Sequence, residues 1–135
     1  MGLKTIGRFV YDNTTPATVA AGQNIPIPTT TVSTNCISND GTNITINKCG
    51  VYQIIANFSF VATATGLIET QMFRNGNALP GAHALDTATT IGNATSQAFS
   101  AVVTVPRNAP NTTINFKAAN ATSVRVANVI VIKVA

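Results

Sequence analysis

The sequence is poor in charged residues, which make up 9% of its 135 residues, whereas about 25% is usual in globular domains. Thr and Asn fill the polar positions instead. Catalysis depends on several positioned groups with perturbed pKa values, and this chain offers four acidic residues and one histidine. We therefore expect a protein that is not an enzyme.

The few titratable side chains form no recognisable catalytic pattern. Asp40 belongs to an Asp-Gly turn, where Asp is favoured for the backbone conformation, and Asp12 also lies in a turn-like sequence. His83 and Asp86 stand three residues apart, but two ligands do not make a metal site. Glu69 is isolated. We expect no catalytic residue, no metal and no cofactor; the alternative is a calcium ion bound by three copies of one Asp or Asn on a symmetry axis.

The basic residues are scattered singly along the chain, which carries a net charge of +4. Nucleic-acid-binding proteins usually gather such residues into a patch interleaved with aromatics, so we expect a mildly basic surface and no nucleic-acid partner. The start of the chain, MGLKTIGRFVYDN, lacks the apolar core of a signal peptide. No run of about 20 apolar residues could span a bilayer. We expect a chain made in the cytoplasm without a signal peptide and without membrane insertion.

The two cysteines, Cys36 and Cys49, flank a turn and a short strand. A hairpin centred on Asp40 and Gly41 would place Cys36 near Thr45 rather than near Cys49. This favours two buried free thiols, since reduced cysteine behaves as a small core residue. A longer loop could still bring the two sulfur atoms together, so a Cys36–Cys49 disulfide is the alternative.

Strand patterns follow one another along the whole chain, and helical spacing is nearly absent. Strands are expected over residues 5–11, 43–47, 50–62, 96–106, 112–119 and 123–135. Pro26 and Pro28 confine 22–34 to an edge or irregular strand, and the Asn75-Gly76 pair predicts a hairpin within 67–81. At least eight short strands in sequence predict one all-β domain over residues 1–135, an antiparallel two-sheet sandwich of the jelly-roll type.

Two of these strands are uncharged or apolar on both faces. In 50–60, the even-numbered side chains are those of a protein core, and the odd-numbered ones are Val51, Gln53, Ile55, Asn57 and Ser59. In the closing strand, one side carries Val124, Val126, Ile130 and Ile132, and the other carries Ala127, Val129 and Val131. A strand that is apolar on both faces is normally covered on both. Because no helix is expected, further copies of the chain are the economical cover, and a homo-oligomer is expected; the alternative is a monomer with a few exposed apolar residues.

Three segments carry a family resemblance. KCGVYQIIANFSF resembles the Gly-x-Tyr strand of the complement/tumour-necrosis-factor-like jelly-roll superfamily. FRNGNALPGAHA is similar to the Asn-Gly hairpin and Pro-Gly segment of bacterial and phage members, and VANVIVIKVA is similar to their closing strand. The resemblance covers most of residues 5–135 and implies a compact homotrimer, in which strand 50–60 and the closing strand line the three-fold axis. The residues expected at that interface are Val51, Gln53, Ile55, Asn57, Val129 and Val131.

The resemblance is stronger to short standalone bacteriophage members than to animal members, because no collagen-like stalk is present. It implies a structural protein on the exterior of the virion, namely a capsid-decorating or head-fibre knob that binds the phage capsid or another virion protein. Residues 1–5 are the candidate attachment arm. The alternative is a trimeric receptor-binding or adhesin module that contacts host-surface glycan or protein through loops such as 81–95. The absence of Trp and the presence of only two Tyr favour the structural role, because sugar sites usually need an aromatic platform.

Overall fold

The computed structural model describes residues 5–34, 36–108 and 111–135, which fold into ten β-strands and no helix. The strands are β1 (Ile6–Val19), β2 (Thr29–Ser33), β3 (Ile37–Asn39), β4 (Ile44–Ile46), β5 (Gly50–Val61), β6 (Gly66–Arg74), β7 (Asn77–Ala88), β8 (Ala94–Val105), β9 (Thr112–Ala118) and β10 (Thr122–Lys133). Among these residues, no helix is long and apolar enough to cross a membrane.

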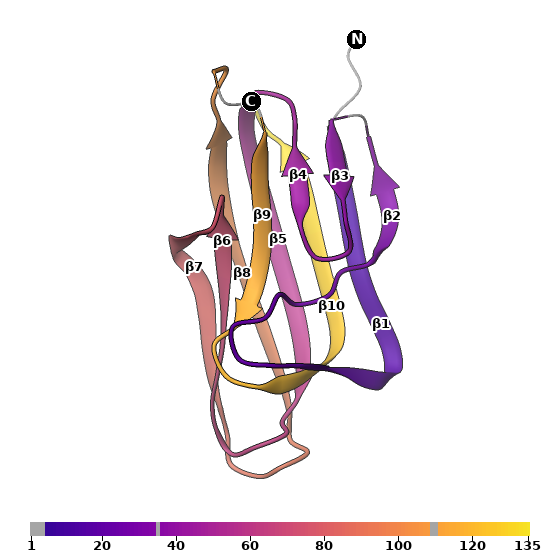
Figure 1. Cartoon of the computed structure of the whole chain (residues 1–135), viewed down its shortest axis with the longest axis vertical. Helices are drawn as coiled ribbons and strands as arrows, with labels where there is room; N and C mark the ends of the chain where they lie inside the picture. The colour runs from indigo at the N-terminus through magenta and orange to yellow at the C-terminus, as the bar shows by residue number, and fades with distance from the viewer. Residues whose placement is uncertain (1–4, 35, 109–110) are drawn as a thin grey trace.

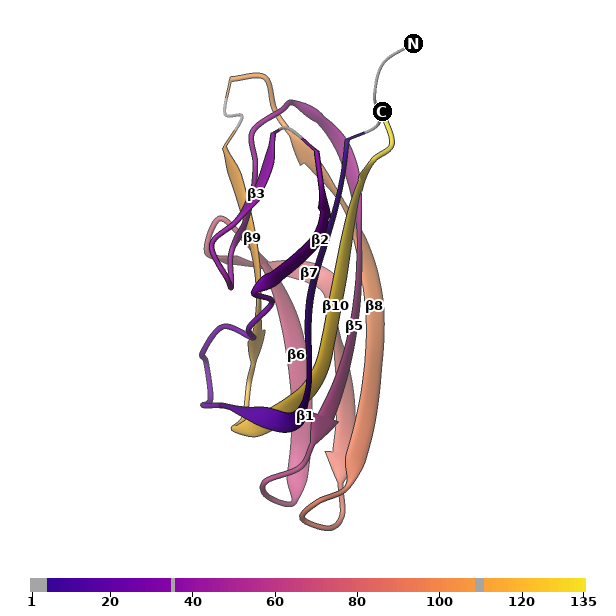
Figure 2. The same cartoon turned by 90° about the vertical axis from the view of Figure 1, so that its right-hand side faces the viewer.

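The strands form two antiparallel sheets that pack face to face (Figures 1 and 2). The first, called here the β5 sheet, has the order β2-β1-β10-β5-β8, and the second, the β9 sheet, has the order β3-β4-β9-β6-β7. Consecutive strands repeatedly cross from one sheet to the other, as in a jelly roll. The all-β, two-sheet antiparallel architecture predicted from the sequence is confirmed.

Turn chemistry places several strand ends as predicted. Asn75 and Gly76 join β6 to β7 with positive φ angles of 50° and 83°, as a two-residue turn between twisted strands requires. The proline-containing stretch contributes only β2, which lies at the edge of the β5 sheet. The predicted loop over residues 81–95 is wrong for most of its length, because β7 runs to Ala88 and β8 begins at Ala94.

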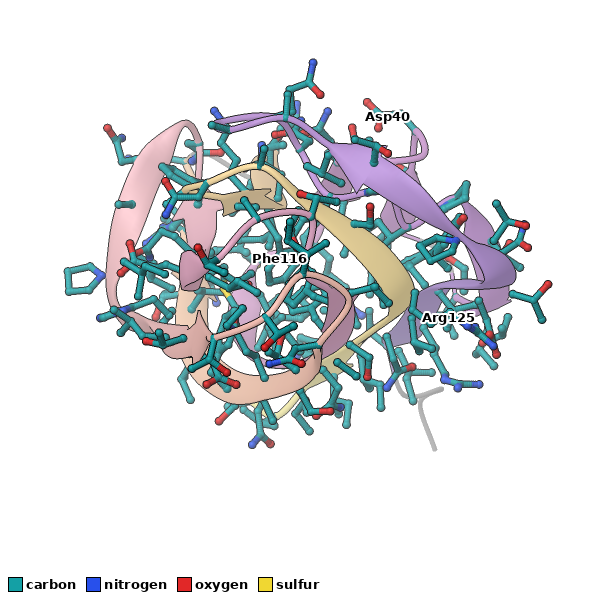
Figure 3. The ribbon with its side chains drawn as sticks, turned by 90° about the horizontal axis from the view of Figure 1, so that it is seen from below. Asp40, Phe116 and Arg125 are labelled. Atoms are coloured by element: carbon teal, nitrogen blue, oxygen red, sulfur yellow. The ribbon has the colours of Figure 1, made fainter. Side chains whose placement is uncertain are left out.

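The core fills the space between the two sheets. Along β5 the even-numbered side chains from Tyr52 to Phe60 are all buried, as the alternation predicts. Phe116 of β9 lies at the middle of the sandwich (Figure 3). Its ring centroid is 5.3 Å from that of Phe58 in an edge-on arrangement and 6.1 Å from that of Phe99. Such aromatic pairs add about 0.5–1.5 kcal/mol each beyond the burial of area.

A bulge in β10 changes which of its side chains face the core. Val124 pairs with Phe60, but Val126 already pairs with Ser59, so Arg125 is an extra residue in β10. A bulge shifts the inward and outward alternation of the strand by one residue. Val129 and Val131 therefore point inward, opposite Ala56 and Ile54, and are fully buried. Their predicted place at an interface on the outer side of the sheet is wrong.

The two cysteines are both free thiols, so the alternative of a Cys36–Cys49 disulfide is not realised in the structure. Cys36 is exposed and Cys49 is half-buried, which corrects the expectation of two buried thiols. The predicted pairing of Cys36 with Thr45 is also wrong, because residues 40–43 form the turn between β3 and β4. The Cys36 carbonyl instead accepts a hydrogen bond from the Asn47 N–H.

Candidate functional site: the outer face of the β5 sheet

The outer face of β5 carries the side chains that alternate with the core residues. Val51, Gln53 and Ile55 are half-buried on this face, and Asn57 is exposed. The prediction that these four side chains point away from the core of their own chain is confirmed. A side chain that is half-buried on a sheet surface without partners is shielded by its neighbours on the adjacent strands, so those neighbours complete the face.

The adjacent strand β10 presents Asn128, Ile130 and Ile132 on the same face. Ile130 lies directly opposite Ile55, and Ile132 lies opposite Gln53. Sequence reasoning missed both isoleucines as interface candidates because it assigned them to the other side of the strand. A bulge depends on the pairing partner of a strand, so the β10 sequence alone gave no signal for it.

The flanking strands extend this face in both directions. On β8, Val102 lies opposite Gln53 and Ser100 lies opposite Ile55. Val102 is 65% exposed, a large fraction for a valine in the middle of a strand. On β1, Ile6 pairs with Ile132 and Arg8 pairs with Ile130. The centre of the face is therefore mostly apolar, with Gln53 between Val102 and Ile132, and the charged side chain of Arg8 lies to one side.

Polar groups border this apolar centre and hold each other in place. The Arg8 Nε–H donates a hydrogen bond to Asn128 Oδ1 over 2.8 Å. Farther along the sheet, Arg125 and Asp12 form an ion pair at 2.8 Å, and Arg125 lies at the periphery of the molecule in Figure 3. The centre of the outer face is formed by apolar side chains and one amide, namely Val51, Gln53, Ile55, Val102, Ile130 and Ile132. An apolar centre with a polar rim is the arrangement of a protein–protein interface.

The residues considered for acid–base or metal chemistry lie apart. Successive side chains of a strand point to opposite faces of the sheet. Because His83 and Asp86 of β7 are three residues apart, they point to opposite sides. Asp40 accepts hydrogen bonds from the side chain and N–H of Asn43 and from the N–H of Thr42. These bonds lower the pKa of Asp40 from 3.8 to about 2. The ionised carboxylate therefore stabilises the turn. Among the described residues, no group of three His, Cys, Asp or Glu side chains could hold a metal ion.

Tyr52 shows how the end of β5 nearest the termini is built. Its hydroxyl donates to the Lys48 carbonyl oxygen over 2.7 Å. Burial raises the pKa of Tyr52 above its ordinary value, and negative charge on the nearby sulfur atoms of Cys36 and Cys49 raises it further. The phenol therefore stays neutral and acts as a structural hydrogen-bond donor that fixes the backbone of Lys48 at the start of β5.

Comparison with known proteins adds evidence on the fold. No protein-family model matches the chain, and no curated protein matches it in sequence. The solved structure of Eiger TNF from S. frugiperda matches 98% of this chain and 93% of its own, with a TM-score of 0.74 and 12% identity. That of murine APRIL at pH 8.5 matches 98% and 100%, with a TM-score of 0.75 and 10% identity. The PRD1 vertex protein P5 matches all of both chains, with a TM-score of 0.60 and 16% identity.

These identities are too low to carry more than the fold. They come from an insect protein, a mammalian protein and a vertex protein, yet all share the two-sheet arrangement over nearly the whole chain. One fold can serve many unrelated functions. The function of this chain must therefore be argued from its own surface residues and not from the shared fold. The chain has a tumour-necrosis-factor-like jelly-roll fold.

Proposed function

We propose that this chain is a structural protein of a bacteriophage virion: a homotrimeric knob that decorates the capsid or forms part of a head fibre. The observation that carries the proposal is the outer face of the β5 sheet, which has Ile55 and Ile130 side by side and Val102 exposed next to them. The fold shared with a protein described as a vertex protein adds support for the virion.

The outer face supports self-association because burying it is favourable and needs no charge compensation. Water is released from Ile55, Ile130, Ile132 and Val102 when they are covered, at about 25 cal/mol per Å² of apolar area. Gln53 and Asn57 are neutral amides that can both donate and accept hydrogen bonds across an interface. Three copies around one axis give a closed assembly with no free face left, and the resemblance of β5 and β10 to the axial strands of the superfamily favours this symmetry.

On the capsid, the trimer would act by geometry. A three-fold knob matches a three-fold or quasi-three-fold position on a shell, and three weak contacts made together hold much more tightly than one.

Residues 1–4, which make up most of the candidate attachment arm, lie outside the described residues. Thr5 is buried, and its carbonyl accepts a hydrogen bond from the Lys133 N–H over 3.0 Å. The proposal includes no catalytic role.

A second candidate is a trimeric receptor-binding or adhesin module on the same particle. Apolar side chains on and near β6 and β7 favour it: Leu67, Leu85 and Ile91 are 42%, 54% and 68% exposed. Leu67 pairs with Thr87, so Leu85 is its diagonal neighbour on the outer face of the β9 sheet. Such a patch could contact a protein on the host surface, while the outer face of the β5 sheet holds the trimer together.

The experiment that separates the two functions mixes the purified chain with two partners. One is a capsid preparation from which the chain has been left out, and the other is intact host cells. A decoration protein co-sediments with the capsids and saturates at a fixed number of trimers, and Leu85→Ser leaves this binding unchanged. An adhesin binds the cells, and Leu85→Ser weakens that binding. Binding to neither partner would refute the proposed function.

A further inference from the structure

A hollow of about 570 Å³ opens at the end of the sandwich where β5 begins and where β8 and β10 end. It lies near the point marked C in Figure 1. Its volume falls within the range of about 300–1,000 Å³ that is usual for small-molecule sites. Three of its lining residues are basic, namely Lys48, Arg107 and Lys133. These residues come from three separate parts of the sequence, so only the fold gathers them.

No side-chain carboxylate lines this hollow to balance the three cations. The four acidic residues of the chain are all described and lie elsewhere, at Asp12, Asp40, Glu69 and Asp86. Asp12 is already paired with Arg125. With three basic residues and no side-chain carboxylate in its lining, the hollow is positive. Three like charges around one concave surface repel each other and attract an anion.

The backbone around the hollow is shaped to let Lys133 lie across β5. Gly50 has a φ angle of 147°, and a Cβ atom there would come within 2.6 Å of Lys133 Cε and 2.8 Å of the Ala135 oxygen. Only glycine leaves this passage open. The surrounding frame is fixed by hydrogen bonds, from the Tyr52 hydroxyl to the Lys48 carbonyl at 2.7 Å and from the Val134 N–H to the Val51 carbonyl at 2.8 Å. These bonds hold the main chain that carries Lys48 and Lys133 at the hollow.

We propose that this hollow binds a phosphate ester. Arg107 offers a planar fork of N–H donors suited to two oxygens of one phosphate, and the two lysines add compact charges beside it. Val51 and Pro106, both half-buried, also line the hollow, where they can pack against the carbon skeleton that carries the phosphate. Val51 also belongs to the outer face of the β5 sheet, so the hollow adjoins that face. The site belongs to a single chain and does not depend on the proposed virion role. Its ligand is either a small phosphorylated molecule or one unit of a phosphodiester polymer on a cell surface.

The test titrates the full chain with inorganic phosphate, with glycerol 3-phosphate and with a poly(glycerol phosphate) chain, and uses glycerol as the uncharged control. Calorimetry gives the affinity, and amide chemical shifts locate the site. We expect one site per chain, amide shifts at residues 48–51 and at Thr104, Val105 and Arg107, no binding of glycerol, and weaker binding at high salt. Similar affinities for glycerol 3-phosphate and for each polymer unit identify a small-molecule site. A much tighter polymer complex that still depends on Arg107 identifies a polymer site.

Arg107→Gln and Lys133→Met should each weaken binding about tenfold or more, since a hydrogen bond to a charged group is worth about 1.5–3 kcal/mol. Arg107 is exposed, so its variant keeps the fold. Arg125→Gln is the matched control, because it removes the same charge at the other end of β10, and it should leave the affinity unchanged. The proposal is overturned if none of the phosphate probes binds, or if Arg125→Gln weakens binding as much as Arg107→Gln does.

Discussion

Ile130→Asp is predicted to dissociate the proposed homotrimer while leaving the fold of the single chain intact. Ile130 lies on the outer face opposite Ile55, and it is already half-buried within one chain. Complete burial of an isoleucine is worth about 1.5–3 kcal/mol, so covering the remaining half contributes about 1 kcal/mol per copy. Three copies contribute about 3 kcal/mol, which corresponds to a loss of about a hundredfold in association. Three buried carboxylates near one axis add to that loss.

The assay for this prediction is sedimentation equilibrium over a range of protein concentrations, with far-UV circular dichroism as the measure of folding. The matched control is Val129→Asp, one residue away but fully buried in the core. We expect Val129→Asp to unfold the chain, because an unpaired charge in the core is very costly. The reasoning is refuted if Ile130→Asp assembles as the wild type does, or if Ile130→Asp unfolds while Val129→Asp stays folded.

Three further predictions concern the stability of the sandwich, and each is measured by chemical denaturation. Phe116→Ala should lower the free energy of unfolding by about 3–5 kcal/mol, because Phe116 is fully buried against Phe58; a loss below about 1 kcal/mol would contradict its central position. Gln97→Ala should cost about 1–3 kcal/mol, because Thr70 Oγ1 then loses its 2.7 Å hydrogen bond to Gln97, and adding Thr70→Val should recover part of the loss. Asp40→Ala should destabilise the chain at neutral pH. The folded pKa of Asp40 is lowered from 3.8 to about 2, so this stabilisation is present above 3.8 and is lost as the pH falls towards 2; a difference between variant and wild type that stays constant with pH would count against it.

The alternation of β5 could be predicted because it is a local property of the sequence. Every second residue from Tyr52 to Phe60 is apolar, and a strand with one buried face requires this period. The hairpin at Asn75 and Gly76 is likewise local, since both residues favour the positive φ angles that the turn needs. Local strand and turn signals of this kind, repeated along the whole chain, were sufficient for the fold class.

The faces of β10 could not be predicted in the same way. Its outward and inward side chains are both β-branched or small, so hydrophobicity does not tell the faces apart. The bulge at Arg125 is set by the pairing with Phe60 and Ser59, which lie far away in sequence. The result is that the candidate interface contains Ile130 and Ile132 and not Val129 and Val131.

The basic hollow could not be predicted from the sequence either. Lys48, Arg107 and Lys133 are isolated in the chain, and an even scatter of basic residues predicts no site. The sandwich brings together the start of β5 and the ends of β8 and β10, and so gathers the three cations at one end. Similarly, residues 81–95 are rich in small and polar residues and looked like a loop, but the pairing of β7 with β6 makes most of them strand.

The most direct test of the central claim is the solution mass of the purified chain, measured by light scattering on a sizing column. We expect a single species of about three times the 14.0 kDa chain mass, held together through the outer face of the β5 sheet. A species with the mass of one chain at micromolar concentration would contradict the homotrimer and would require a different partner to cover Ile55, Ile130 and Val102.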